Sequence, residues 1–475
     1  MLPLDARLEA WQRDLLARPG VLRRAVADYG SPVNLHHLAP MGRNALDLTL
    51  GARRSGLGLG IFVARKANRA LAVVDEARRL GHGVDVAGER ELAETLERGV
   101  PPERVIVTAA VKPEGLLALC VARRVRVSLD NADEVALLAA VAREAGAGVD
   151  GAPPVPVVLR LAVAGPRESR FGLPAAVWRE VVRTRMPVGG PLAVDGLHFH
   201  LDGYAAADRS EGLRQALALA EALRALGHRP AFIDIGGGVP MSYLERRDQW
   251  LRFWRAHRAA LLGRGRPLTF EGHPLGLGVA AGRVTGAPAV YPAHQSPTGG
   301  AWLEAVLGAP ARGAGPAPPS EPGTVGRALA RAGLALHAEP GRALLDGCGM
   351  TVARVEFRKR RRDGTWLIGL AMNRTQMRSA ADDFLVDPLL VPVAGRERAA
   401  APVEGYLVGA YCIERELITW RRLRFPRGVE VGDLLAFPNT AGYLMHILES
   451  ASHRIPLAAN LVVGPDGHLM GDAGG

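Results

Sequence analysis

The chain has 475 residues, of which 48% are hydrophobic and 23% charged, so it is long enough to form two globular domains. No apolar run approaches the ~18 residues that cross a membrane, and residues 1–20 lack the apolar centre of a signal peptide, so we expect a cytoplasmic protein with no membrane partner. The net charge of +11 admits nucleic-acid binding. Aromatic residues make up only 5%, however, and no basic stripe is interleaved with them, so we expect no nucleic-acid partner.

Strand-like apolar runs alternate with helix-like runs from about residue 59 onward. The first four strand-like runs end near residues 66, 88, 110 and 131, a spacing that fits one strand plus one helix and predicts parallel strands. Seven such strands precede residue 240, and an eighth candidate, LALHAEPG, spans residues 334–341. Eight units predict a closed TIM-type (β/α)8 barrel rather than an open doubly wound sheet, because no GxGxxG motif follows the first strand.

The barrel is predicted to span residues 41–345, with a Pro/Gly-rich insertion at about 285–330 that includes GAPARGAGPAPPSEPG, expected to be a flexible loop. After residue 345 strand-like runs separated by turns replace the helices, so residues 346–475 are predicted to form a C-terminal β-rich domain, a barrel or a sandwich. Residues 1–40 lack the barrel periodicity and contain the strand-like run PVNLHHL. We expect this segment to pack with the β-rich domain.

The carboxyl ends of the barrel strands are where a (β/α)8 barrel carries its active site. The residues with useful chemistry at these ends, or just beyond them, are Lys66, Asp85, Arg160, His198, His200, Gly236, Gly237, Gly238, Glu339, Gly341 and Arg342. A metal centre is not expected, because His198 and His200 have no third ligand at suitable spacing. The cysteines at positions 120, 348 and 412 are also too scattered for a zinc cluster.

Lys66 is unusual because only three of the 59 basic residues in the chain are lysine. Arginine keeps its proton in proteins and cannot attack a carbonyl, whereas a lysine whose pKa is lowered by burial or by its neighbours forms Schiff bases. A lysine at a strand end can also be a solvated surface residue, but arginine normally fills that role in this chain. We therefore predict that Lys66 is a Schiff-base lysine.

The run DIGGGVP, residues 234–240, ends the seventh strand with three glycines whose backbone N–H groups can close around a phosphate. Arg342, just past the eighth strand, can add a forked cation. A phosphate cradle together with a Schiff-base lysine predicts pyridoxal 5'-phosphate as the cofactor. Glu339 can then keep the pyridine nitrogen protonated, and His200 can stack on the ring.

The motifs of the chain, in their order, resemble those of the fold-type III pyridoxal-phosphate-dependent decarboxylases of the diaminopimelate and ornithine decarboxylase kind. The resemblance covers about residues 30–450 and rests on VARKAN, GVDVAGERELAETL, RFGL, LHFHLDG, DIGGG, EPGR, GAYC and TAGY. It implies an alanine racemase-like barrel, a β domain that completes the active site, and a head-to-tail homodimer that shares its active sites across the interface.

The resemblance also implies a role for each matching residue. The cofactor-binding residues would be Lys66, Asp85, Arg160, His200, Gly236, Gly237, Gly238, Glu339, Gly341, Arg342 and Tyr443. Glu91 would lie behind Asp85, and Tyr443 would be a further phosphate ligand. Cys412 of the GAYC motif would donate a proton after decarboxylation. In such a dimer Cys412 and Tyr443 would both cross the subunit interface.

Two departures from the family pattern concern the substrate. The family usually has Gly-Ser two and three residues after the stacking histidine, where this chain has Asp202 and Gly203, so a phosphate-binding hydroxyl is lost and a carboxylate is gained. After the cysteine the family usually has Asp or Glu and then Asp four residues on, where this chain has Ile413 and Glu416. We expect the carboxylates Asp202, Glu414 and Glu416 to contact the substrate, so the family's known specificities do not carry over.

The leading hypothesis is an amino-acid decarboxylase, a carboxy-lyase acting on a small-molecule substrate of the diaminopimelate, ornithine or arginine class. One alternative is an amino-acid racemase or epimerase on the same fold. Glu339 speaks against it, because a racemase prefers a weaker electron sink at the pyridine nitrogen, often an arginine. A second alternative is a non-catalytic pyridoxal-phosphate-binding regulator, which the changed residues near His200 and Cys412 allow.

Overall fold

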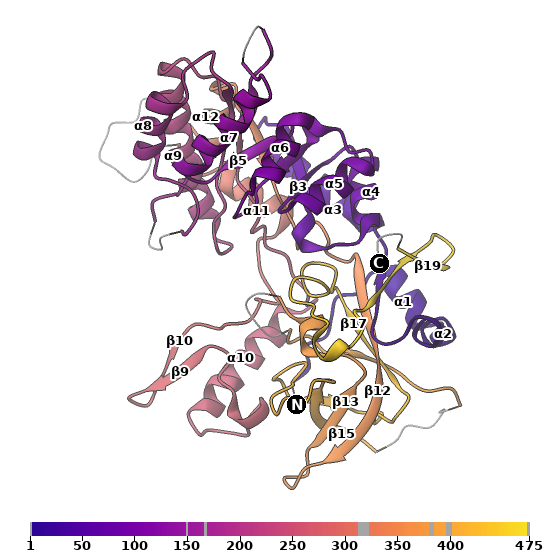
Figure 1. Ribbon diagram of the computed structural model, residues 1–475. Coiled ribbons are helices and arrows are strands. Elements are labelled where there is room, and N and C mark those ends of the chain that lie inside the picture. The colour runs from indigo at the N-terminus through magenta and orange to yellow at the C-terminus, as the bar shows by residue number, and fades with distance from the viewer. Residues whose placement is uncertain are drawn as a thin grey trace.

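The computed structural model describes residues 2–148, 151–165, 169–311, 323–379, 384–395 and 401–472, which form two halves (Figure 1). The upper half in Figure 1 is a closed barrel of parallel strands in the order β11-β2-β3-β4-β5-β6-β7-β8. The strands are β2 (Leu59–Ala64), β3 (Gly83–Val86), β4 (Val105–Val107), β5 (Arg126–Leu129), β6 (Val155–Arg160), β7 (Leu192–His198), β8 (Phe232–Asp234) and β11 (Ala335–Ala338). The last strand pairs with both β8 and β2, so the predicted (β/α)8 barrel is confirmed.

Helices with one apolar face surround this barrel (Figure 1). They are α3 (Ala39–Arg54), α4 (Leu71–Arg79), α5 (Glu89–Glu97), α6 (Glu114–Arg123), α7 (Ala132–Glu144), α8 (Ala175–Arg185), α9 (Ala206–Ala225), α11 (Gly299–Leu307) and α12 (Val325–Arg331). In α9, for example, Leu213, Ala216, Ala220 and Leu223 recur at helical spacing and are all buried. None of the described helices is both long and apolar enough to span a membrane.

The interior of the barrel is filled by a layer of apolar side chains below the carboxyl ends of the strands. Phe62, Ile106, Val158 and Phe232 come from alternate strands and form one buried cluster. Because side chains of a strand alternate between its two faces, the inward positions two residues further on are the next layer. In β6 and β8 those positions are Arg160 and Asp234, so the polar site stands on a packed apolar floor.

The lower half in Figure 1 is a β-rich domain, which confirms the predicted fold class. Its strands are β1 (Val33–His36), β12 (Gly349–Arg360), β13 (Trp366–Leu370), β14 (Leu389–Val391), β15 (Val403–Val408), β16 (Leu423–Phe425), β17 (Leu434–Pro438), β18 (Ala459–Val463) and β19 (Leu469–Gly471). The amino-terminal strand β1 pairs with both β12 and β18. Two further amino-terminal helices, α1 (Ala10–Leu16) and α2 (Pro19–Tyr29), bury apolar residues against this sheet.

The segment after β8 leaves the barrel, although residues 41–345 were all predicted to belong to it. The helix α10 (Arg247–Leu261) and the hairpin of β9 (Leu277–Ala280) and β10 (Arg283–Gly286) lie beside the β-rich half (Figure 1). The N–H of Phe270 donates to the carbonyl of Trp420 at 2.8 Å, and its ring packs with Tyr406 and Leu417. This aromatic surface joins the segment to the β-rich half, so the barrel half is not continuous in sequence.

The Pro/Gly-rich insertion at 285–330 contains a helix. Trp302, Leu303, Val306 and Leu307 of α11 are buried, and α11 lies so close to α3 that a Cβ on Gly51 would be 2.4 Å from the carbonyl oxygen of Gly300. The composition misled the prediction here, because glycines that suggest a loop instead permit close helix packing. Most of GAPARGAGPAPPSEPG, residues 312–322, lies outside the described residues.

Replacing Trp302 by alanine is expected to lower the free energy of unfolding by about 3–5 kcal/mol, because the indole is 2% exposed and fills the space beneath α11. Its N–H, which donates to the carbonyl of Tyr204 at 2.8 Å, would also be lost. Denaturant unfolding of the variant measures the effect. The partly exposed Trp250 on α10 is the matched control. If Trp250→Ala lowered the free energy of unfolding as much as Trp302→Ala does, Trp302 would have no special role in holding α11.

Candidate active site

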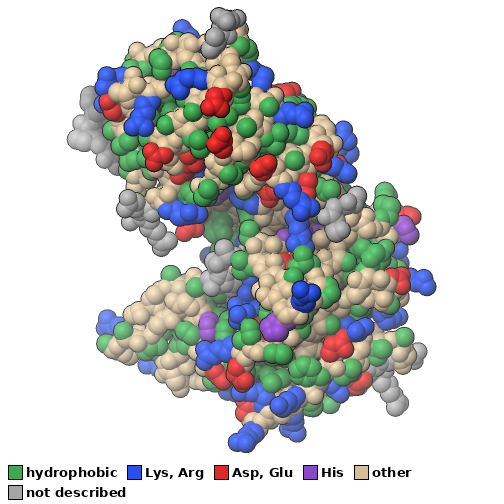
Figure 2. Space-filling model, in the orientation of Figure 1, with side chains coloured by type: hydrophobic (Ala, Val, Ile, Leu, Met, Phe, Trp, Pro, Cys, Tyr) green, Lys and Arg blue, Asp and Glu red, His purple; other side chains and the backbone are tan. Residues whose placement is uncertain are grey.

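A cavity of about 550 Å³ lies where the carboxyl end of the barrel meets the β-rich half. Its lining includes His200, Gly238 and Arg342 from the barrel side and Tyr443 and Ile447 from the β-rich side. In the space-filling view the two halves are separated by a deep hollow (Figure 2). Both halves therefore contribute to the lining of this cavity.

Lys66 lies in the short turn that follows β2, and its Nζ is 2.5 Å from Oδ2 of Asp85. The carboxylate of Asp85 is buried and also accepts a hydrogen bond from the Thr108 hydroxyl. Burial by itself lowers the pKa of Lys66, but attraction to Asp85 and Glu339 outweighs it and raises that pKa. The expectation of a lowered lysine pKa is therefore wrong for the protein alone, in which Lys66 is a cation between two acids.

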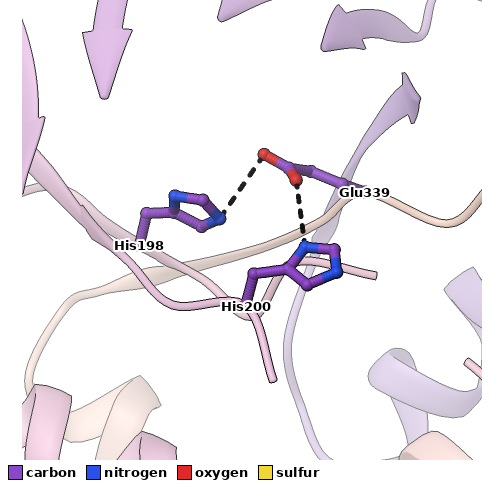
Figure 3. A group of neighbouring side chains, drawn as sticks. All are labelled: His198, His200 and Glu339. Atoms are coloured by element: carbon purple, nitrogen blue, oxygen red, sulfur yellow. Dashed lines mark ion pairs between the residues drawn. The ribbon is translucent and has the colours of Figure 1, made fainter. Parts of the chain in front are cut away.

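Glu339 follows β11 and is 1% exposed, and its carboxylate lies between the rings of His198 and His200 (Figure 3). Its two oxygens are each 3.7 Å from an imidazole nitrogen, which is too long for a hydrogen bond. Neither oxygen has a hydrogen-bond partner among the described residues. A buried acid without partners is costly, and burial accordingly raises the pKa of Glu339.

The two histidines beside Glu339 are neutral. Burial lowers the pKa of His200 to about 3 and the pKa of His198 well below its ordinary value. The N–H of Gly237 donates to Nδ1 of His200 at 3.3 Å, so this nitrogen carries no proton. The contacts drawn in Figure 3 are therefore not ion pairs, and Glu339 is left without a cation on the histidine side.

The same three side chains could also hold a metal ion, because their ligand atoms lie within 4.8 Å of one another. The argument that His198 and His200 lack a third ligand is therefore wrong. Glu339 is that residue, about 140 positions away in the sequence and brought near by closure of the barrel. A cationic ring nitrogen would satisfy the same carboxylate. The glycine loop 236–238 and the cation Arg342 across the site favour such a phosphorylated ring over a bare metal ion.

Glycines 236–238 form a narrow loop at the end of β8. Gly236 and Gly238 have φ angles of 65° and 75°, which side chains disfavour. A Cβ on Gly238 would lie 2.0 Å from Nη2 of Arg209, and one on Gly341 would lie 2.6 Å from the Tyr443 hydroxyl. The loop and Gly341 are thus kept bare, as a cradle for an anion requires.

Arg342 is fixed at the cavity by aromatic side chains. Its guanidinium lies 4.1 Å from the ring centre of Tyr291 and 5.1 Å from that of Tyr443, and it donates to the hydroxyl of Tyr243 at 3.2 Å. Tyr243 and Tyr291 belong to the segment after β8, so this long segment shapes the site. Sequence reasoning missed both tyrosines, because nothing near them in the sequence signals the contact.

Tyr443 belongs to the cavity of its own chain. Its N–H donates to the carbonyl of Ala67 at 2.7 Å, next to Lys66. The expectation that Tyr443 crosses a subunit interface is therefore wrong, because the β-rich half of the same chain delivers it.

Two further buried groups complete the barrel end of the site. Arg160 lies 3.4 Å from Asp130 and 4.0 Å from the ring centre of Phe171 in the RFGL motif. Asp234 was not predicted, although its inward position two residues after Phe232 could have indicated it. One of its oxygens accepts the N–H of Gly236 at 2.8 Å, the other has no partner among the described residues, and burial raises its pKa. Glu91 lies further back and accepts the N–H of Ala87.

The predicted residues of the GAYC segment do not line the cavity of their own chain. Cys412 and Glu414 are exposed, whereas Glu416 is 3% exposed and accepts the backbone N–H of Arg374 at 2.7 Å. The predicted substrate contact of Glu416 does not fit this geometry, because its carboxylate faces into the β-rich half. Asp202 does line the cavity.

Comparisons with known proteins agree with this geometry. The family model described as pyridoxal-dependent decarboxylase, pyridoxal binding domain, matches residues 53–260. The chain is 31% identical over 457 residues to the uncharacterized protein y4yA of Sinorhizobium fredii, covering 95% of this chain and 92% of that relative. It is 28% identical over 226 residues to a diaminopimelate decarboxylase of Archaeoglobus fulgidus, covering 46% and 52%. The chain therefore belongs to the fold-type III family of pyridoxal-dependent decarboxylases, as its motifs predicted.

Solved structures agree on the fold. The diaminopimelate decarboxylase of M. jannaschii in complex with L-lysine matches with a TM-score of 0.69 at 16% identity, covering 95% of this chain and 91% of that one. The arginine decarboxylase of Paramecium bursaria Chlorella virus matches with a TM-score of 0.64 at 14% identity, covering 94% and 99%. Both matches extend over the barrel and the β-rich half together.

Proposed function

We propose that the protein is a pyridoxal-phosphate-dependent decarboxylase of an amino acid, with Lys66 as its cofactor lysine. The observation that carries the proposal is the buried carboxylate of Glu339, which has no partner among the described residues and shares one site with Lys66 and a glycine cradle. A carboxylate in that position suits a protonated pyridine nitrogen, which is what distinguishes a strong electron sink from the weaker one of a racemase.

The residues present fit the cofactor at both of its ends. Glu339 would hold the ring nitrogen, His200 would cover the ring, and Lys66 would hold the aldehyde carbon. The phosphate would be bound by Gly236, Gly237, Gly238, Gly341, Arg342 and Tyr443. When bound, pyridoxal phosphate supplies an electron-withdrawing ring that stabilises the negative charge left when a carboxyl group departs as CO2.

Lys66 has to lose a proton before its amine can react. Asp85 lies 2.5 Å from Nζ, and burial raises the pKa of this carboxyl, so Asp85 is the group positioned to take that proton. Arg160, on the same face of the barrel, would keep the summed negative charge of Asp85 and Glu339 from becoming prohibitive. The neutral rings of His198 and His200 exclude water from Glu339 without adding a competing cation.

Cys412 is proposed to return a proton to the α-carbon, but from the neighbouring subunit of a homodimer. The proposal is supported by the position of Cys412 within one chain. Cys412 is exposed and does not line the cavity of its own chain, so its loop is accessible to a second subunit. Glu414, in the same exposed loop, would then join Asp202 near the distal group of the substrate.

The proposal is tested by incubating the holoenzyme with single amino acids of either configuration while CO2 release and optical activity are both followed. Stoichiometric CO2 with at least one basic or dicarboxylic amino acid is the expected result. Inversion of configuration without CO2 would establish the racemase alternative. A pyridoxal-containing protein that does neither would favour the regulator.

Mixing two inactive variants tests the shared site. Lys66→Ala and Cys412→Ala are each expected to be nearly inactive, and refolded mixtures are expected to regain about one quarter of the activity, because half of the random dimers carry one intact site of two. Cys120→Ala is the control, because it replaces a buried thiol that has no role in the proposed reaction. No recovery in dimers proven to be mixed would show that Cys412 does not act across an interface.

A further inference from the structure

Arg209, in the first turn of α9, is a buried arginine that the family motifs do not assign. It is 0% exposed, and no carboxylate pairs with it among the described residues. Burial lowers the pKa of Arg209 to about 10, while the exposed carboxylates of Asp208 and Asp202 partly oppose this shift, so Arg209 remains a cation at neutral pH. A buried cation close to the positive end of a helix is unfavourable unless an anion pairs with it directly.

One nitrogen of Arg209 donates hydrogen bonds to three backbone carbonyls. Nη2 donates to the carbonyl oxygen of Leu201 at 2.8 Å, of Gly203 at 2.9 Å and of Gly237 at 3.2 Å. These carbonyls belong to two loops, one after β7 and one after β8, that both line the cavity. Arg209 therefore connects the two loops from the buried side, away from the cavity.

Because a peptide unit is planar, the hydrogen bonds from Arg209 to the carbonyls also fix the direction of the N–H groups in the same peptide units. In a trans peptide the N–H of the next residue points opposite to the carbonyl. Holding the carbonyls of Gly203 and Gly237 turns the N–H groups of Tyr204 and Gly238 the other way, and both residues line the cavity. Neither of these N–H groups donates a hydrogen bond within the described part of the chain.

The contact also explains two sequence features. Gly238 has to be glycine because a Cβ there would lie 2.0 Å from Nη2 of Arg209. Gly203 replaces the serine whose hydroxyl binds phosphate in the resemblance described above, so the cradle of this chain lacks one neutral donor.

We propose that Arg209 is a positioning residue for the cofactor phosphate: it turns the N–H groups of Tyr204 and Gly238 toward the phosphate and supplies the buried positive charge that offsets the missing hydroxyl. Its Nε and Nη1, which have no partner among the described residues, add to that field. This inference rests on the proposed function, because it names the part of the same site that recognises the phosphate group.

The experiment compares the binding of pyridoxal phosphate and of pyridoxal, which lacks the phosphate, to the full chain by equilibrium dialysis. Arg209→Met is expected to weaken pyridoxal phosphate between about 10- and 100-fold, the range for lost hydrogen bonds to a charged group, and to change pyridoxal less than about threefold. Arg209→Lys keeps the charge and is expected to fall between wild type and Arg209→Met. Arg214→Met, on the same helix but ion-paired with Glu211, is the control without effect.

Equal losses for both ligands would overturn the proposal, since they indicate general loosening of the loops, and unchanged binding of pyridoxal phosphate would overturn it as well. If Arg209→Met does not fold, the ratio of the two affinities in Arg209→Lys decides, because a purely structural role leaves that ratio at its wild-type value. Failure of the proposed function looks different: wild-type protein would then bind neither compound.

Discussion

Replacing Lys66 by alanine is expected to lower kcat at least about 1,000-fold, the scale for loss of a covalent nucleophile. Arginine at this position should be equally inactive, because it restores a cation beside Asp85 but cannot react with an aldehyde. The comparison matters because Lys66 also balances two buried acids, so Lys66→Ala should lose stability as well as activity, whereas Lys66→Arg should lose mainly activity.

The measurement combines activity with borohydride reduction of the holoenzyme and mass spectrometry of its peptides. A pyridoxyl group on the peptide containing Lys66, absent from both variants, is the expected result. Lys359→Ala changes an exposed lysine in β12 and is the control. A label on another lysine would show that the site has been misassigned even if activity fell.

Exchanging Glu339 for glutamine is expected to have opposite effects on catalysis and on stability. The amide cannot hold a protonated ring nitrogen, so kcat should fall about 100- to 1,000-fold, as when a preorganised electrostatic partner is removed. The protein without cofactor should nevertheless become more stable, because the change removes a buried charge that has no partner among the described residues.

The pH dependence of that stability has a definite sign. The folded-state pKa of Glu339 lies above its ordinary value of 4.5, so as pH rises past 4.5 the unfolded chain releases a proton that the folded chain still holds. Stability of the apoprotein should therefore fall with rising pH through this window. The pKa of Asp85 and Asp234 is also raised, so Glu339→Gln should make the fall shallower without abolishing it. Melting temperatures of the wild-type apoprotein and of Glu339→Gln, measured over a series of pH values, test this expectation. If the two proteins showed the same dependence on pH, Glu339 would have to be paired in solution.

Much of the barrel could be predicted because its information is local. Each strand–helix unit shows its own hydrophobic periodicity within about 22 residues. The inward positions at the strand ends follow from the alternation of side chains between the two faces of a strand. Lys66, Asp85, Arg160 and Glu339 were predicted as site residues in that way. Asp234 could have been predicted as well, since it lies two residues after the inward Phe232.

The prediction failed where contacts join distant segments. The segment after β8 was predicted to belong to the barrel, yet its Phe270 packs with Tyr406 and Leu417 of the β-rich half. Tyr291 contacts Arg342 from that segment, and Tyr443 of the β-rich half of the same chain contacts Ala67, the residue after Lys66. Such contacts depend on how two folded halves dock, which short-range sequence patterns do not encode.

The sequence by itself determined the class of the barrel, and it predicted the cofactor and the lysine expected to hold it, because each of these follows from residue type and spacing along the chain. Only the tertiary structure decided the electrostatics. It placed Asp85 and Glu339 close enough to raise the pKa of Lys66, left Glu339 between two neutral imidazoles, and set Arg209 behind the glycine loop. The physical reason is that charges interact through distance and burial, and both are properties of the folded molecule.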